Sequence, residues 1–388
     1  MSKLQLPIPV TLAAHPPRLL FLDGIRGFLA LSVVLSHTYG ALTSWSSRMP
    51  VRGAYLAVDC FFVISGFVLT HTLTQRPDSW IGYFGKRLAR LWPLHVASMM
   101  LILVLLRNNG LHGQFVPAWW HPGVIRAVWA NILMLQNLSW LKGIADQAIN
   151  EPSWSISVEF WVSGLVLYPL VKARGYGALC LAIVAYASLR WCSPYPFQTF
   201  GDIGLPLSGG LLRGIGGISL GNAAFKFVAY LRRQRAPIAS AAISYGKYVL
   251  LLPLAFVVYA GDSRLCWIAL ILFVLFIVIA SLEATPDRIL GSAVPVWLGE
   301  VSFSVYLMHM AVIVCLTPKS YAQLWGNQGA ALYTLALAVV LAAVTHYGFE
   351  APSRRYLYGL LRSRRRKHVV VQPRLRTGSG KNRPVILP

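Results

Sequence analysis

The stretch FLDGIRGFLALSVVLSHTYG, residues 21–40, decides the fold class of this chain. It is long enough to cross a bilayer as one helix, yet it contains Asp23, Arg26 and His37. An ionisable side chain in a spanning helix costs about 2.5–3.5 kcal/mol on insertion scales unless it is paired, reaches the interface or faces water. The stretch is therefore interpreted as a transmembrane helix whose charged residues have a use.

The composition favours a membrane protein over a soluble one. Of 388 residues, 56% are hydrophobic and 12% are charged, and the mean hydropathy is +0.59. A soluble domain carries about twice that share of charged residues. We predict an all-α, polytopic transmembrane helix bundle of about ten spans. The apolar windows that define these spans are 19–40, 53–73, 91–106, 154–172, 176–192, 205–231, 245–261, 265–283, 296–316 and 329–350.

The net charge of +23 is interpreted as an orientation signal rather than as a site for nucleic acid. With both termini in the cytoplasm, the segments on that side collect 25 of the 35 Lys and Arg residues, which is the asymmetry that orients membrane proteins. Residues 1–18 then form a cytoplasmic N-terminal segment. Residues 357–388 form a basic cytoplasmic tail, which we expect to be disordered and attracted to anionic lipid.

The cysteines predict neither disulfides nor a metal site. Five are scattered singly along the chain without a CxxC or Cys/His spacing, so they are interpreted as small packing residues. Residues 1–18 lack an apolar core, and we expect no cleavable signal peptide.

Charged and polar residues recur inside the predicted spans. Arg26 and His37 are eleven residues apart, so a helix places them on nearly the same face, separated by about 16 Å along its axis. His37, Glu159 and His309 are expected at comparable depth on three different helices, with Asp59 and Arg213 also inside spans. Such a cluster indicates a functional site by default. The alternative is a snorkelling arginine together with polar groups that merely satisfy one another.

Three basic residues precede the third span in YFGKRLARLWP, namely Lys86, Arg87 and Arg90. Arg87 and Arg90 share a helix face, and paired guanidinium groups suit bidentate binding of phosphate. The positive-inside rule explains the same residues without any ligand, and on spacing alone we favour that explanation.

Six motifs occur in order along the chain: DGIRGFLALSVVLSH, VDCFFVISGFVL, FGKRLARLWP, PSWSISVEFW, SFSVYLMH and FEAPSRR. Together they resemble the acyltransferase-3 family of integral membrane acyltransferases, over residues 20 to 356. The transmembrane acyltransferase domain is accordingly assigned to residues 19–356, without an appended SGNH-type esterase domain. The glycine-rich sixth span and the long basic tail depart from the family pattern.

The resemblance implies a bacterial inner-membrane enzyme that takes an acyl group, most often acetyl, from cytoplasmic acetyl-CoA. It implies a hydroxyl acceptor on a carbohydrate or lipid-linked glycan, and no metal. The family's functional positions map onto a catalytic Arg/His pair, a donor-binding group and a set on later helices. In this sequence they are Arg26 and His37; Arg87, Arg90 and the Ser65-Gly66-Phe67 motif; and Trp154, Ser155, Glu159 and His309.

These positions suggest a mechanism. His37 is the candidate general base, because a neutral imidazole can take a proton from an attacking hydroxyl near pH 7. Glu159 or Asp59 is predicted to orient His37, and Arg26 to stabilise negative charge or shape the channel. Lys86, Arg87, Arg90 and Ser65 are assigned to the donor. Trp154, Ser155, His309 and Arg213 are assigned to the acceptor.

Other functions fit part of the pattern. A proton-coupled transporter would use the same His, Glu and Arg residues as a relay, but we find no internal repeat of the motifs. A small secondary metabolite such as a macrolide is an alternative acceptor. A membrane scaffold without enzymatic activity would leave unexplained why His37, Glu159 and His309 are expected at comparable depth in three helices.

Overall fold

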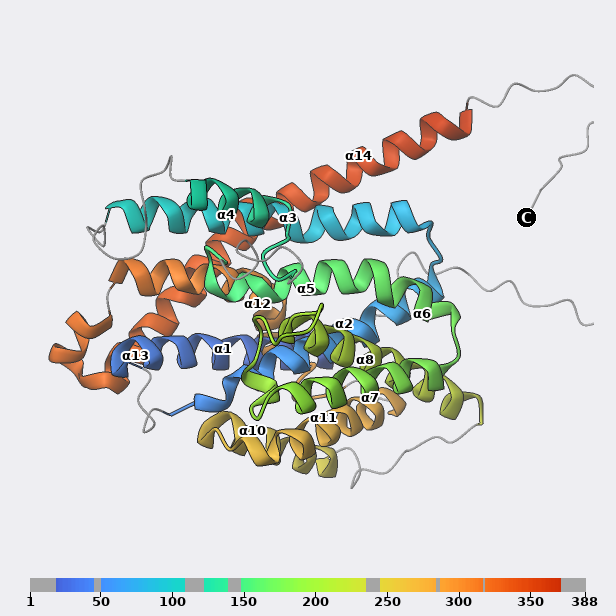
Figure 1. Cartoon of the computed structure of the whole chain (residues 1–388), viewed down its shortest axis with the longest axis horizontal. Coiled ribbons are helices and arrows are strands. Elements are labelled where there is room, and N and C mark those ends of the chain that lie inside the picture. Colours follow the sequence, from blue (N-terminus) through green and yellow to red (C-terminus); the bar gives the residue numbers. More distant parts are fainter. Residues whose placement is uncertain are drawn as a thin grey trace, which may run out of the picture.

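The computed structural model describes residues 19–44, 50–108, 122–138, 148–234, 245–283, 287–316 and 318–370, which form an all-helical bundle (Figure 1). The predicted N-terminal segment, residues 1–18, lies outside the described residues. The helices are α1 (Leu20–Thr43), α2 (Tyr55–Gln75), α3 (Trp80–Asn108), α4 (Pro122–Ile132), α5 (Trp154–Val162), α6 (Tyr168–Lys172), α7 (Gly175–Cys192), α8 (Gly209–Arg233), α10 (Leu252–Ala260), α11 (Cys266–Leu282), α12 (Ala293–Leu316), α13 (Pro318–Thr345) and α14 (Ala351–Val370).

Eight helical segments among the described residues are long and apolar enough to cross a membrane, and each coincides with an expected span. The other two expected spans are also helical. Glycines lower the hydropathy of α8, and the apolar segment Lys247–Ala260 is shorter than the eight. Large apolar side chains such as Trp191 (93% exposed) and Ile183 cover the outside of the bundle. Such exposure suits contact with lipid tails rather than water.

Two close helix contacts bring the site residues together. Gly299 of α12 lies against α1, where a Cβ atom would overlap the carbonyl oxygen of Asp23. Gly221 of α8 lies in the same way against the carbonyl oxygen of Val63 in α2. Small residues at these points let the helix backbones approach. The glycine-rich sixth span forms one continuous helix, α8, and its glycines allow this close packing.

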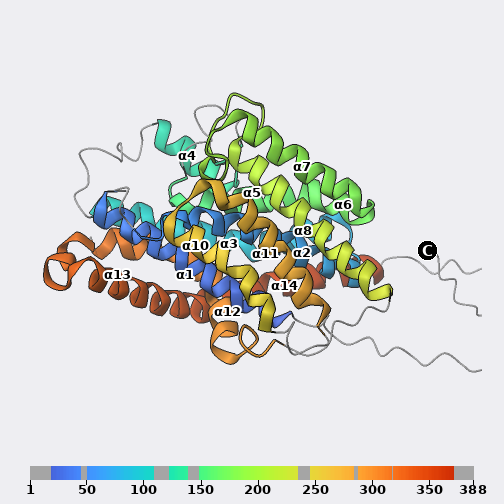
Figure 2. The same cartoon turned by 90° about the horizontal axis from the view of Figure 1, so that it is seen from below.

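Two helices depart from the expected bounds. The third span was placed at 91–106, but α3 begins at Trp80, so the basic motif lies within the helix. The tail was expected to lack regular structure from residue 357, but α14 continues through Val370; residues 371–388 lie outside the described residues. A π-helical turn, His346–Glu350, joins α13 to α14. In Figure 2, α7 and α13 lie on opposite sides of the bundle.

Candidate active site

Two cavities lie inside the bundle. The first, here called the arginine cavity, has a volume of about 510 Å³ and is lined by Arg26, Arg87, Arg90 and Arg354 among others. The second, here called the histidine cavity, has a volume of about 430 Å³ and contains His37 in its wall. Val58 and Tyr306 line both cavities, so these two side chains lie at the boundary between them.

The predicted donor residues lie in the arginine cavity, with one exception. Arg87 Nη2 contacts Glu159 Oε1 at 2.7 Å, and Ser65 Oγ donates a hydrogen bond to the same oxygen. Ser65, Arg87 and Arg90 all line the cavity. Lys86 is the exception: its side chain is half exposed and its Nζ pairs with Asp78 at 2.7 Å, away from both cavities.

Neither predicted carboxylate contacts His37. Glu159 is held by Arg87 and Ser65 in the arginine cavity. Asp59 is fully buried, and its Oδ2 pairs with Nη2 of Arg213 at 2.7 Å between α2 and α8. The expectation that one of them orients His37 is therefore wrong, because each carboxylate forms an ion pair with an arginine on a neighbouring helix. Their importance for activity stays a prediction.

His37 instead contacts His309, which is consistent with the similar depth expected for the two histidines. His309 Nε2 lies 3.0 Å from His37 Nδ1, and the two rings stack with centroids 5.1 Å apart. His309 is completely buried on α12, and its Nδ1 lies 3.1 Å from the carbonyl oxygen of Val305. It does not line either cavity, so the acceptor contact predicted for it is not present in this arrangement.

These contacts fix the proton positions of both rings. A carbonyl oxygen only accepts, so Nδ1 of His309 carries a proton and donates it to Val305. In the neutral ring Nε2 of His309 is then an acceptor, and Nδ1 of His37 must donate to it. Nε2 of neutral His37 therefore has no proton and can accept one. This is the protonation state that a general base requires.

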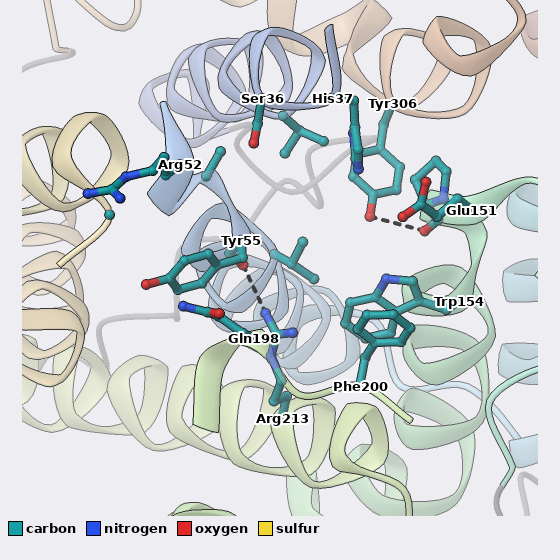
Figure 3. A pocket seen from close by; sticks show the side chains of 15 residues that line it. Ser36, His37, Arg52, Tyr55, Glu151, Trp154, Gln198, Phe200, Arg213 and Tyr306 are labelled. Carbon is teal, nitrogen blue, oxygen red and sulfur yellow. Dashed lines mark hydrogen bonds between the residues drawn. The ribbon is translucent and has the colours of Figure 1, made fainter. Parts of the chain in front are cut away.

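The walls of the histidine cavity combine aromatic and charged side chains (Figure 3). Trp154 and Phe200 stack with ring centroids 5.4 Å apart, and the Arg213 guanidinium lies 5.1 Å from the Trp154 ring. Trp154 and Arg213 thus both line the histidine cavity, and their role in binding an acceptor stays a prediction. Ser155 lines the arginine cavity, and its Oγ lies 2.8 Å from the Tyr306 hydroxyl.

Glu151, Tyr306 and Arg354 are among the lining residues that were not identified from the sequence. Glu151 lines the histidine cavity with His37, and its only signal is its place directly before the Pro-Ser-Trp motif. Tyr306 stands at the boundary and donates to the Pro152 carbonyl at 3.1 Å. Its spacing from His309 places both on one face of α12, which could have identified it. Arg354 belongs to the motif FEAPSRR. Its place in the arginine cavity depends on how α14 packs in the bundle, which the sequence does not show.

Within the described residues, no group of three or more His, Cys, Asp or Glu side chains is placed to hold a metal ion.

Sequence comparisons show the family of this chain. A family model described as an acyltransferase domain matches residues 19–346. The chain belongs to the acyltransferase-3 family. Its members include membrane-bound acyltransferases, and this chain is an acyltransferase.

Several curated proteins are similar over most of the chain. Acyltransferase MdmB of Streptomyces mycarofaciens is 28% identical over 88% of this chain and 94% of its own length. The putative membrane-bound transacylase BcsY of Komagataeibacter xylinus is 28% identical over 82% of this chain and 79% of its own. The putative peptidoglycan O-acetyltransferase YrhL of Bacillus subtilis is 24% identical over 86% of this chain, which spans about half of YrhL. No solved structure matches the chain significantly.

Proposed function

We propose that this acyltransferase moves an acyl group, most often acetyl, from cytoplasmic acyl-CoA to a hydroxyl group of a carbohydrate or glycolipid. The donor occupies the arginine cavity, the acceptor occupies the histidine cavity, and His37 is the general base. The observation that carries the proposal is that one cavity gathers four arginines, the other contains His37, and both are lined by Val58 and Tyr306.

The proposed topology has ten spans and cytoplasmic termini. It is supported by the packing of α8 against α2 and α7 inside the bundle, which gives this helix the surroundings of a spanning segment. The excess of Lys and Arg in the segments on one side supports the orientation. The arginine cavity then opens toward the cytoplasm, where acyl-CoA is present.

The charge of the arginine cavity suits the phosphate groups of coenzyme A. Guanidinium groups bind phosphate through two parallel hydrogen bonds, and in a site that excludes water these bonds are stronger than at an exposed surface. With its phosphates held by arginines, the donor can extend its flexible pantetheine arm toward Tyr306. The thioester then reaches the boundary between the cavities.

The reaction needs one proton acceptor at that boundary. Nε2 of His37 takes the proton of the acceptor hydroxyl while the oxygen attacks the thioester carbonyl carbon. A new C–O bond forms, the C–S bond of the tetrahedral intermediate breaks, and the proton passes from the imidazolium to the leaving thiolate. The products are the acyl ester and coenzyme A. Hydrogen bonding to His309 holds His37 in the required tautomer throughout.

The acceptor is proposed to be a carbohydrate on the basis of the histidine cavity. Stacked Trp154 and Phe200 provide an aromatic wall, while Glu151, Gln198 and Arg52 supply polar groups around it. Rings and hydroxyl groups of a sugar match this combination of apolar and polar surface. The similarity to YrhL, a putative peptidoglycan O-acetyltransferase, supports the same class of acceptor.

The test is transfer of radiolabelled acetyl from acetyl-CoA in membranes that contain the protein together with glycan acceptors. We expect the wild type to form an ester that hydroxylamine releases. His37→Ala should lose at least about 100-fold of this activity, the usual contribution of a general base, at an unchanged protein level. Retained activity in His37→Ala would remove His37 as the base, and absence of transfer in the wild type would contradict the proposed combination of donor and acceptor.

A further inference from the structure

Helix α14 brings an arginine from the end of the bundle into the arginine cavity. It packs against α3, and the Tyr358 hydroxyl donates to the Lys86 carbonyl at 3.4 Å. One helical turn earlier on α14, Arg354 lines the cavity together with Arg87 and Arg90. Figure 1 shows α14 beside α3 and extending beyond the rest of the bundle.

The arginines of this cavity differ in how strongly they are already bound. Arg87 is buried and paired with Glu159 at 2.7 Å, so this carboxylate neutralises it. Arg90 forms no ion pair or hydrogen bond within the described part of the chain, and the charges that act on it are those of Arg26 and Arg87, which repel it, and of Glu159, which attracts it. The cavity therefore contains a cation that lacks an anionic partner in close contact.

Arg354 is positioned by a carboxylate that has other partners. Glu350, one turn before it, accepts from Ser304 Oγ at 2.7 Å and contacts His346 Nδ1 at 2.9 Å, both through Oε2. Its other oxygen lies 3.5 Å from Nη1 of Arg354, whose side chain is 30% exposed. Glu350 thus directs the guanidinium without enclosing it, and most of the five N–H groups of an arginine stay available to a ligand.

We propose that Arg354 binds the phosphate groups of the acyl donor, together with Arg90. This inference rests on the proposed use of acyl-CoA. It assigns donor binding to α14, and it assigns Arg87 to holding Glu159 rather than to the phosphates. Two guanidinium groups from different helices face one cavity, which is the arrangement that binds a pyrophosphate or a nucleotide phosphate through charge-assisted hydrogen bonds.

The neighbouring residue provides a matched control. Arg355 is exposed on the same helix and does not line either cavity, so Arg355→Ala removes the same charge from the same segment. Arg354→Lys keeps the charge but lacks the planar fork of donors. If the basic segment acts only through its total charge, Arg354→Ala and Arg355→Ala should raise the KM for acetyl-CoA equally.

The experiment measures acetyl transfer against two donors, acetyl-CoA and S-acetylpantetheine, which lacks the nucleotide and its phosphates. For acetyl-CoA we expect Arg354→Ala to raise KM about 10- to 100-fold, with kcat within about threefold of the wild type. Arg354→Lys should show a smaller increase in KM. With S-acetylpantetheine, Arg354→Ala and the wild type should have the same KM.

The outcomes distinguish a failure of the role of Arg354 from a failure of the proposed use of acyl-CoA. Equal KM values for Arg354→Ala and Arg355→Ala with acetyl-CoA would overturn the role of Arg354 while leaving the donor intact. An equal effect of Arg354→Ala on both donors would also overturn it, because the phosphates would then not be involved. If purified wild-type protein in neutral detergent fails to bind tritiated coenzyme A, the donor itself is wrong.

Discussion

The contact between His37 and His309 leads to the most specific prediction. Replacing His309 by alanine removes the acceptor that lies 3.0 Å from His37 Nδ1. When His37 takes a proton, this hydrogen bond becomes one from a charged donor, and such bonds contribute about 1.5–3 kcal/mol. If this contribution is made in the transition state, its loss lowers kcat about 10- to 150-fold. The KM values for donor and acceptor should change little, because His309 does not line either cavity.

The assay is steady-state acetyl transfer by purified protein, with His309→Gln as the conservative variant. Gln keeps an oxygen that accepts a hydrogen bond, so it should recover part of the rate that Ala loses. A double-mutant cycle adds His37→Ala. If His309 acts through His37, the double variant should be as slow as His37→Ala alone. A further drop in the double variant, or equal rates for His309→Gln and His309→Ala, would refute the role of the pair.

Two further predictions concern the contacts that hold the site together. Gly299→Ala should destabilise the protein by at least about 1–3 kcal/mol, as overpacking does, because its Cβ would overlap the backbone of Asp23. Gly359→Ala, with no atom within 4 Å of the added Cβ, is the control and should not lower the melting temperature in detergent. Asp59→Asn should cost about 3–5 kcal/mol, because it leaves Arg213 buried without its counter-ion. The combined change of Asp59→Leu and Arg213→Met should recover much of that loss; inactive single variants with wild-type melting temperatures would instead show that the pair acts in the chemistry.

Much of the fold could be predicted because hydropathy and charge directly report burial in a membrane. All ten predicted spans are helical, and eight satisfy the length and apolarity of a membrane span. The bounds of α3 and α14 were missed for one physical reason. A helix can continue beyond the apolar layer of the membrane, because polar residues also allow intrahelical hydrogen bonding. Hydropathy therefore indicates where the chain crosses the membrane, but not where the helix ends.

The sequence identified many residues of the candidate site, but it did not predict which of their side chains contact each other. Helical periodicity and position along the chain were enough to predict that His37 and His309 lie at similar depth, but their contact became visible only in the structure. The partners of Glu159 and Asp59 depend on which helices are neighbours and how they are rotated, and a single sequence does not specify this. Glu159 on α5 pairs with Arg87, and Asp59 on α2 pairs with Arg213. Neither carboxylate is therefore next to His37, where one or the other had been expected.

Tyr306 stands where the two cavities meet, so the central claim is that acyl transfer occurs between a donor on one side of the membrane and an acceptor on the other. Sealed vesicles of known orientation test it, because acetyl-CoA does not cross the bilayer. Labelled acetyl-CoA added outside inside-out vesicles should label glycan enclosed within them, and His37→Ala vesicles should not do so. Right-side-out vesicles should incorporate label only after permeabilisation. Efficient transfer from external acetyl-CoA in sealed right-side-out vesicles would contradict the account.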